Sequence, residues 1–312
     1  TAAPNRITVI DMARFYAIAM VFYGHFIEEF MLLKSAAGAS QYKFIYTFHM
    51  VLFVLIAGYV ATESQTEWRL GRFLRHRFLT RLLPFIFFNA VMMIPPAFLS
   101  GKFFGLELPS LTGYRQGLLN TAFGLPSFCI PSWFLLLIIG LELLHYGVFR
   151  FLKASNLRIL VAIPIFYLAG YQLNLHLDIF NPLKGRTIGW NYFFIHEAIT
   201  LYSFYLLGIY LRRRRFLMDK RPSGLLSAGA VICFLIVLLT YKLNTGPYNF
   251  HVYNYVVILF ASHGHILLFP LTAVAGCAMI LFAAKLTPTT RPLTWLGGNT
   301  LILMCLNGIF YH

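Results

Sequence analysis

Residues 224–243 read GLLSAGAVICFLIVLLTYKL, and Lys242 is the one charged residue in the stretch. A helix rises ~1.5 Å per residue and the hydrocarbon core of a bilayer is about 30 Å thick, so about 20 apolar residues are needed to cross it. The stretch meets this requirement. It is therefore predicted to be a transmembrane helix.

The same test identifies further apolar runs along the chain. They are residues 7–33, 44–62, 79–99, 132–150, 157–173, 192–211 and 264–286, with a shorter run at 298–312 that follows the turn signal LGGN. The run 250–261 is short, and it is either an interfacial helix or a tenth, broken span. We predict an all-α, polytopic transmembrane helix bundle with about nine or ten spans, a truncated last helix and one domain over 1–312.

The composition excludes a water-soluble fold. Hydrophobic residues make up 59% of the 312 residues and charged residues 11%, whereas a soluble domain has about a quarter charged residues. The net charge of +15 lies in short loops, which disfavours a nucleic-acid-binding surface. The four cysteines lack the spacing of metal ligands, so no metal site is predicted.

The basic residues predict the orientation of the chain. They gather at 69–81, 150–158 and 212–221, and these loops share one side of the membrane with Arg6. Cytoplasmic loops are enriched in Lys and Arg, so the N-terminus is predicted to be cytoplasmic, and the basic loops are predicted to lie close to anionic membrane lipids. The loop at 101–130 is then external.

The first span carries ionisable residues that are costly in hydrocarbon. Asp11, Arg14, His25, Glu28 and Glu29 project within about 100° of one another, so they form one polar stripe that is predicted to face the bundle interior. Arg14 and His25 stand about 16 Å apart along the helix, a spacing that suits the two ends of an elongated ligand. Alternatively, Asp11 and Arg14 form an intrahelical ion pair while His25 bonds a neighbouring helix.

A set of short motifs occurs in order along the chain. They are DMAR at 11–14, GH at 24–25, FHMVLF at 48–53, AGY at 57–59, RLLP at 81–84, PSWFL at 131–135, YLLG at 205–208 and LGGNTL at 296–301. In this order they resemble the acyltransferase 3 family of integral membrane O-acyltransferases, and the chain is similar to the stand-alone type.

The resemblance implies a reaction and a set of residues. It implies transfer of an acyl group, commonly acetyl, from cytoplasmic acetyl-CoA to a hydroxyl of a surface or lipid-linked glycan, in a bacterial inner membrane. His25 is then the candidate base and Arg14 an anchor for the donor, with Asp11 beside it. A neutral, partly desolvated histidine suits proton removal from a sugar hydroxyl. The predicted contacts of the acceptor are His49, Glu28 and Trp133.

Coenzyme A carries phosphates, and guanidinium groups bind phosphate with two hydrogen bonds. The predicted donor-binding residues are Arg69, Arg72, Arg75, Arg77 and Arg81. The positive-inside rule alone is the other explanation of this cluster. Arg81 favours a functional role because it lies in an apolar run, before Pro84.

Three further hypotheses follow from the polar residues. Glu142 and His145 are three residues apart in a predicted helix and form a polar pair that is able to bond a neighbouring helix. The polar stripe of the first span also suits a transporter or flippase of a small anion or lipid-linked precursor. Finally, His25 and His49 lie on successive antiparallel helices, so they are candidate ligands of a haem group.

Overall fold

The structure is a computed structural model, and it describes residues 7–94, 102–103, 106–107, 110–176, 192–219, 222–248 and 254–308. Helices dominate these residues, which confirms the predicted all-helical fold class. The strands of the described residues are two short ones, β1 (Lys102–Phe103) and β2 (Leu106–Glu107), which pair antiparallel.

The chain divides into two compact units, one made of residues 1–60 and 204–303 and the other of residues 61–203 and 304–312. The elements of the first unit are α1 (Thr8–Leu32), α2 (Ala36–Tyr46), α3 (His49–Val60), α10 (Ser223–Thr240), η6 (Ile258–Phe260), α11 (Leu268–Leu286) and α12 (Arg291–Gly298). The elements of the second unit, besides the strands, are η1 (Glu63–Glu67), α4 (Leu70–Arg77), η2 (Phe78–Leu82), α5 (Leu83–Met92), α6 (Leu111–Ala122), η4 (Ile130–Ser132), α7 (Trp133–Leu152), α8 (Asn156–His176) and η5 (Tyr192–Phe194). Helices α9 (Ile195–Arg213) and α13 (Thr300–Leu306) each run from one unit into the other.

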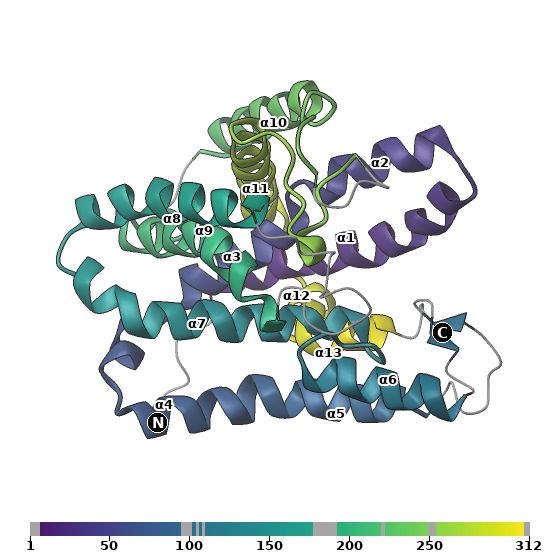
Figure 1. The fold of residues 1–312 in the computed structure, drawn as a ribbon. Helices are drawn as coiled ribbons and strands as arrows, with labels where there is room; N and C mark the ends of the chain where they lie inside the picture. The colour runs from purple at the N-terminus through teal and green to yellow at the C-terminus, as the bar shows by residue number, and fades with distance from the viewer. Residues whose placement is uncertain are drawn as a thin grey trace. The chain divides into compact units, whose positions relative to one another are not determined.

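In the first unit α1 is the central helix. It packs against α2, α3, α11 and α12, and α10 lies beside α11 (Figure 1). In the second unit α7 has this role, because it packs against η1, η2, α5, α8 and η5. The central helix of each unit also carries polar residues. Helix α1 carries Asp11, Arg14 and His25, and α7 carries Glu142 and His145.

Helices α3 and α9 cross at two glycines of the sequence motifs. A Cβ atom added at Gly58 would lie 2.0 Å from the carbonyl oxygen of Tyr205, and one added at Gly208 would lie 2.1 Å from that of Leu55. Both approaches are to backbone, which cannot move aside as a flexible side chain does. Close backbone approach of this kind is a common use of small residues in membrane helix packing.

Among the residues that the structure describes, five helical segments are long and apolar enough to cross a membrane. They are Ala36–Val60, Ile130–Leu152, Asn156–His176, Ser223–Thr240 and Leu268–Leu286. Helices α1 and α9 have 25 and 19 residues and carry ionisable side chains such as Asp11 and Glu197. The composition of these segments makes the chain an integral membrane protein.

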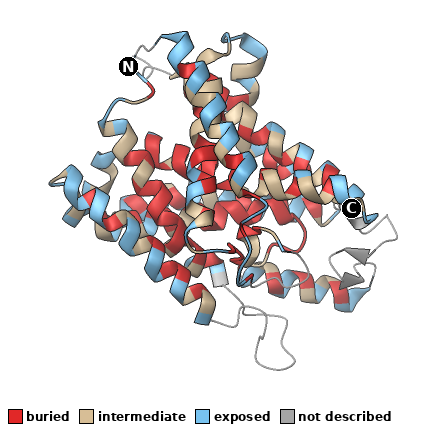
Figure 2. Cartoon of the chain, turned by 90° about the horizontal axis from the view of Figure 1, so that it is seen from above, coloured by how far each residue is buried: buried red, intermediate tan, exposed pale blue. Residues whose placement is uncertain are grey.

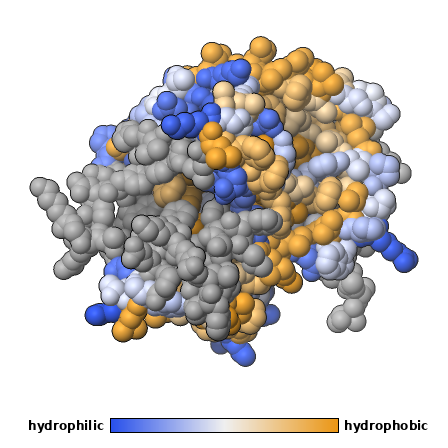
Figure 3. Space-filling model, turned by 90° about the vertical axis from the view of Figure 1, so that its right-hand side faces the viewer, coloured by the Kyte–Doolittle hydropathy of each residue, from blue (hydrophilic) through white to orange (hydrophobic). Residues whose placement is uncertain are grey.

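Apolar side chains cover much of the described surface, as expected where lipid replaces water. Buried residues concentrate on the inward faces of the helices (Figure 2), and orange apolar side chains are prominent in the space-filling view (Figure 3). On α10, Leu225, Ile232 and Leu239 are each more than half exposed. Exposed leucine and isoleucine in this density are typical of a lipid-facing helix.

Three details of the sequence prediction have an outcome in the structure. Residues 111–122 form helix α6 in the segment predicted as an external loop. Of the run 250–261, predicted as an interfacial helix or a broken span, residues 254–261 hold one 3-10 turn, η6, and no α-helix, and residues 250–253 lie outside the described residues. The turn signal LGGN is confirmed, because α12 ends at Gly298 and α13 begins at Thr300.

Candidate functional site

The polar residues at the start of α1 form the ion pair that the sequence left as an alternative. Arg14 Nη1 lies 3.9 Å from Asp11 Oδ1, with side-chain exposures of 30% and 7% respectively. The backbone of Asp11 is also a contact point for α12, since a Cβ atom at Gly297 would lie 1.8 Å from the Asp11 carbonyl oxygen. Close packing with α12 therefore fixes Asp11, while the guanidinium of Arg14 remains partly accessible.

Further along α1, His25 lies against the junction of α2 and α3. His25 interacts electrostatically with His49, and a Cβ atom at Gly24 would lie 2.9 Å from the ring of Tyr46. The structure thus brings together two predicted site residues, His25 and His49. His25 is half-buried and His49 is 2% exposed.

A break between α2 and α3 orients His49. Phe48 N–H bonds the Ile45 carbonyl oxygen at 3.2 Å, and His49 Nδ1 lies 3.0 Å from the same oxygen. A carbonyl oxygen only accepts, so Nδ1 carries a proton, and in the neutral imidazole Nε2 is the acceptor nitrogen. A neutral imidazole with a defined tautomer is the form that can accept a proton or a hydroxyl hydrogen bond.

The predicted polar stripe of α1 is correct for most of its residues and wrong for Glu29. Glu29 is exposed, whereas Glu28 is half-buried and interacts electrostatically with Tyr46. Consecutive residues of a helix point about 100° apart, so the two glutamates do not share an environment.

In the second unit, α4, η2 and α5 form one continuous helix with a π-helical segment at Phe78–Leu82. Leu83 N–H bonds the Phe78 carbonyl oxygen, five residues back. The cause is Pro84, which has no N–H to bond the Thr80 carbonyl and whose ring clashes with it. Arg81 Nη1 donates to the Thr80 carbonyl instead, at 3.3 Å. Such π-bulges are frequent at functional sites.

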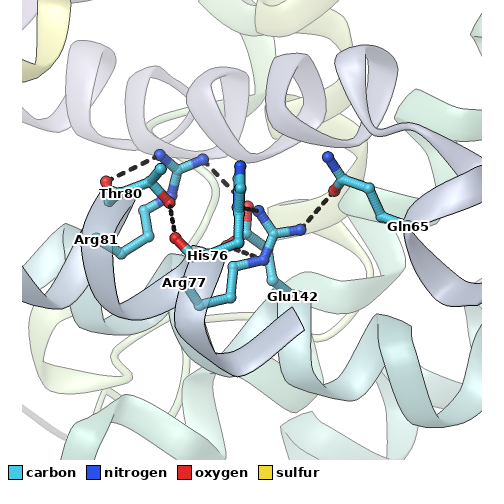
Figure 4. A network of polar contacts seen from close by, with 6 residues as sticks. All are labelled: Gln65, His76, Arg77, Thr80, Arg81 and Glu142. Carbon is cyan, nitrogen blue, oxygen red and sulfur yellow. Dashed lines mark hydrogen bonds and ion pairs between the residues drawn. The ribbon is translucent and has the colours of Figure 1, made fainter. Parts of the chain in front are cut away.

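Arg77 and Arg81 share one carboxylate. Arg77 Nε lies 3.2 Å from Glu142 Oε2, and Arg81 Nη2 donates to Glu142 Oε1 at 3.1 Å (Figure 4). The side chains of Arg77 and Glu142 are 9% and 8% exposed, while that of Arg81 is 29% exposed. Two guanidinium groups against one carboxylate leave one net positive charge in this cluster.

Gln65 and His76 complete this cluster, which we call the arginine cluster: Gln65, His76, Arg77, Arg81 and Glu142 (Figure 4). Arg77 Nη2 donates to Gln65 Oε1 at 2.5 Å, and Arg77 Nη1 donates to His76 Nδ1 at 3.3 Å. Burial, and then the positive charge of Arg77, lower the pKa of His76. Because a guanidinium donates to Nδ1, this imidazole is held neutral with an acceptor nitrogen.

The structure separates the five arginines of the predicted donor site. Arg69, Arg72 and Arg75 are exposed, and the Arg72 guanidinium lies 4.5 Å from the centre of the Trp68 ring. Arg77 is buried, which leaves Arg81 as the arginine that is both held by neighbours and partly accessible.

The structure places Trp133 and the pair Glu142–His145 at helix contacts of the second unit. Trp133 is 7% exposed and packs on Phe194, with ring centres 5.4 Å apart. His145 Nδ1 is 3.2 Å from the Tyr202 hydroxyl, while Glu142 bonds the arginines. Glu142 and His145 therefore each bond a neighbouring helix, which confirms the prediction of polar bonds between helices.

Sequence reasoning missed Glu142 as the partner of the arginines, and it missed Gln65, His76 and Tyr46. The available signal was weak. A glutamate in an apolar run needs a positive partner, but Glu142 lies 61 residues after Arg81, and spacing in the chain does not predict which arginine it meets.

Comparison with known proteins gives one match. A family model described as "Acyltransferase domain" matches residues 7–312. Neither the curated proteins nor the solved structures give a match.

Proposed function

Since the chain belongs to this acyltransferase family over residues 7–312 and is a membrane acyltransferase, we propose that it moves an acetyl group from acetyl-CoA to a hydroxyl of a surface or lipid-linked glycan. The family match is the observation that carries the proposal. It favours group transfer over the transport of an anion or a lipid-linked precursor.

In the proposed reaction His25 acts as the base. It takes the proton of the acceptor hydroxyl, the hydroxyl oxygen attacks the thioester carbonyl, the C–S bond breaks and CoA leaves as a thiolate that takes up a proton. A half-buried imidazole beside a second imidazole, whose Nδ1 is held by the Ile45 carbonyl, supports this role. The proposed role of Glu28 and Trp133 is contact with the acceptor.

The arginine cluster is proposed to bind the phosphates of the donor. Arg81 is the best candidate because its side chain is 29% exposed and its guanidinium is held by Glu142 and by the Thr80 carbonyl. The net positive charge of the cluster supports anion binding. The exposed Arg69, Arg72 and Arg75 add a long-range attraction for a charged donor. Arg14, with Asp11 as its partner, is proposed to anchor the donor or the intermediate.

The proposed location is a bacterial inner membrane with the N-terminus in the cytoplasm. The clusters of Arg and Lys at 69–81, 150–158 and 212–221 support this orientation. Acetyl-CoA is a cytoplasmic metabolite, so this orientation puts the arginine cluster on the donor's side.

Radiolabelled acetyl-CoA tests the proposal directly. Wild-type protein in inverted membrane vesicles is expected to place label on lipid-linked or polymeric saccharide, and His25→Ala is expected to insert but transfer none. Wild-type-like transfer by His25→Ala would remove His25 from the mechanism. Mass spectrometry of cell-surface glycans, with and without the gene, identifies the acceptor. A Soret band in the purified protein would instead support haem binding.

A further inference from the structure

One aromatic side chain, Tyr46, contacts Gly24 and His49 in the first unit and interacts electrostatically with Glu28. Its ring lies against the backbone of Gly24, its hydroxyl interacts electrostatically with Glu28, and its ring centre is 4.6 Å from that of His49. Gly24 and Glu28 are one helical turn apart on α1, so they lie on the same face. The Tyr46 ring therefore fills the space between α1 and the junction of α2 and α3.

Gly24 is required for this contact. A Cβ atom at Gly24 would lie 2.9 Å from Tyr46 Cε2, and any larger side chain would push the ring away. The ring has little room to move, because Tyr42 is stacked on it with ring centres 3.6 Å apart. Tyr42 is itself 4% exposed and packs with Tyr255.

The contact lies beside both imidazoles, so it affects the spacing of the two helices that carry them. His25 follows Gly24 directly on α1, and His49 is the first residue of α3. His49 is held by two restraints, the bond to the Ile45 carbonyl and the edge of the Tyr46 ring. A displacement of the Tyr46 ring therefore moves His49 relative to His25.

The geometry points to Tyr46 as a positioning residue, whose ring, seated on Gly24, sets the separation of His25 and His49. The inference rests on the proposed role of His25 as the base. It concerns the ring and not the hydroxyl, because the restraints on α1 and on His49 are both ring contacts.

A double-mutant cycle tests the inference. The variants are Gly24→Ala, Tyr46→Ala and the double variant, with Tyr46→Phe to isolate the hydroxyl. Gly147→Ala is the matched control, because a Cβ atom at this helical glycine meets no atom within 4 Å. Each protein is purified in detergent, its melting temperature is measured, and its kcat and its KM for acetyl-CoA are measured in the labelled-acetyl assay.

Gly24→Ala is expected to lower the melting temperature in the wild-type background and to have no further effect in the Tyr46→Ala background. A displacement of about 1 Å costs about 100-fold in rate, so Gly24→Ala and Tyr46→Ala are each expected to lower kcat by about 10- to 100-fold. The KM for acetyl-CoA stays unchanged, since the donor's phosphates bind elsewhere in the proposal. Tyr46→Phe and Gly147→Ala are expected to keep kcat within about threefold of wild type.

The results distinguish the inference from the proposed function. If the wild type transfers acetyl, His25→Ala abolishes the transfer and Gly24→Ala leaves it intact, the inference is overturned and the proposed function stands. Additive effects of Gly24→Ala and Tyr46→Ala on the melting temperature also overturn it, because the clash would then not involve the ring. Absence of transfer by the wild type in vesicles that contain the acceptor counts against the proposed function, whatever the melting cycle gives.

Discussion

Glu142→Ala is expected to destabilise the protein strongly. The carboxylate of Glu142 is the partner of two guanidinium groups, and Arg77 is 9% exposed, so the variant leaves a buried positive charge without its partner. Breaking a buried ion pair in this way costs about 3–5 kcal/mol. Because Arg81 is 29% exposed and reaches water, we expect the lower part of this range. Glu142→Gln keeps one acceptor oxygen, and its expected cost is about 1–3 kcal/mol.

Thermal unfolding of the purified protein in detergent, followed by tryptophan fluorescence, measures the effect. For a unit of this size the loss corresponds to a fall in Tm on the order of 10 °C. Glu67→Gln is the control, because Glu67 is 65% exposed in its pair with Lys153 and exposed ion pairs contribute little. A Glu142→Ala protein that melts within about 2 °C of wild type would refute the reasoning, since it would mean that water compensates both arginines.

Three further outcomes follow from the same contacts. Arg81→Ala is expected to raise the KM for acetyl-CoA about tenfold or more. Its Tm is expected to change little, because Glu142 keeps its buried partner, Arg77. An unchanged KM in the labelled-acetyl assay would exclude Arg81 from the donor site. The pKa of His76 is lowered from 6.5, so the unfolded state binds the extra proton and the folded state loses stability as the pH falls below about 6.5. The melting temperature of His76→Asn is therefore expected to fall less steeply with decreasing pH than that of wild type. Identical slopes would contradict the shift. Gly58→Ala puts a Cβ atom 2.0 Å from a backbone oxygen and is expected to prevent close packing of α3 on α9, whereas Gly224→Ala meets no atom within 4 Å and is expected to yield folded protein, as size-exclusion chromatography in detergent will show.

The structure gives a physical reason for the glycines in several of the sequence motifs. Gly58 and Gly208 belong to separate motifs, and each meets a backbone carbonyl of the other's helix. Gly297 likewise meets the carbonyl of Asp11, so two motifs at opposite ends of the chain meet in the first unit. Each of these close approaches requires a glycine on one helix and accessible backbone on the other. The motifs are therefore needed together for the helices to pack.

The sequence by itself determined the class of the fold, and it did so for a local reason. Crossing a bilayer requires a run of apolar residues and internally bonded backbone, and both are visible in a stretch such as 224–243 without knowledge of its neighbours. The segment 111–122 escaped this test because it is polar and rich in glycine. Its helix start was nevertheless signalled by Ser110, whose Oγ accepts from Gly113 N–H at 3.0 Å.

Only the tertiary structure decided which polar residues share a site and which of them are accessible. Arg69 and Arg77 look alike in the sequence, yet the first is exposed and the second is buried against Glu142, which lies in another helix. The partnership of Gly24 with Tyr46 joins residues from successive helices in the same way. Such pairs depend on the angle and distance at which helices pack, and these are set by the summed contacts of many side chains rather than by the spacing of any motif.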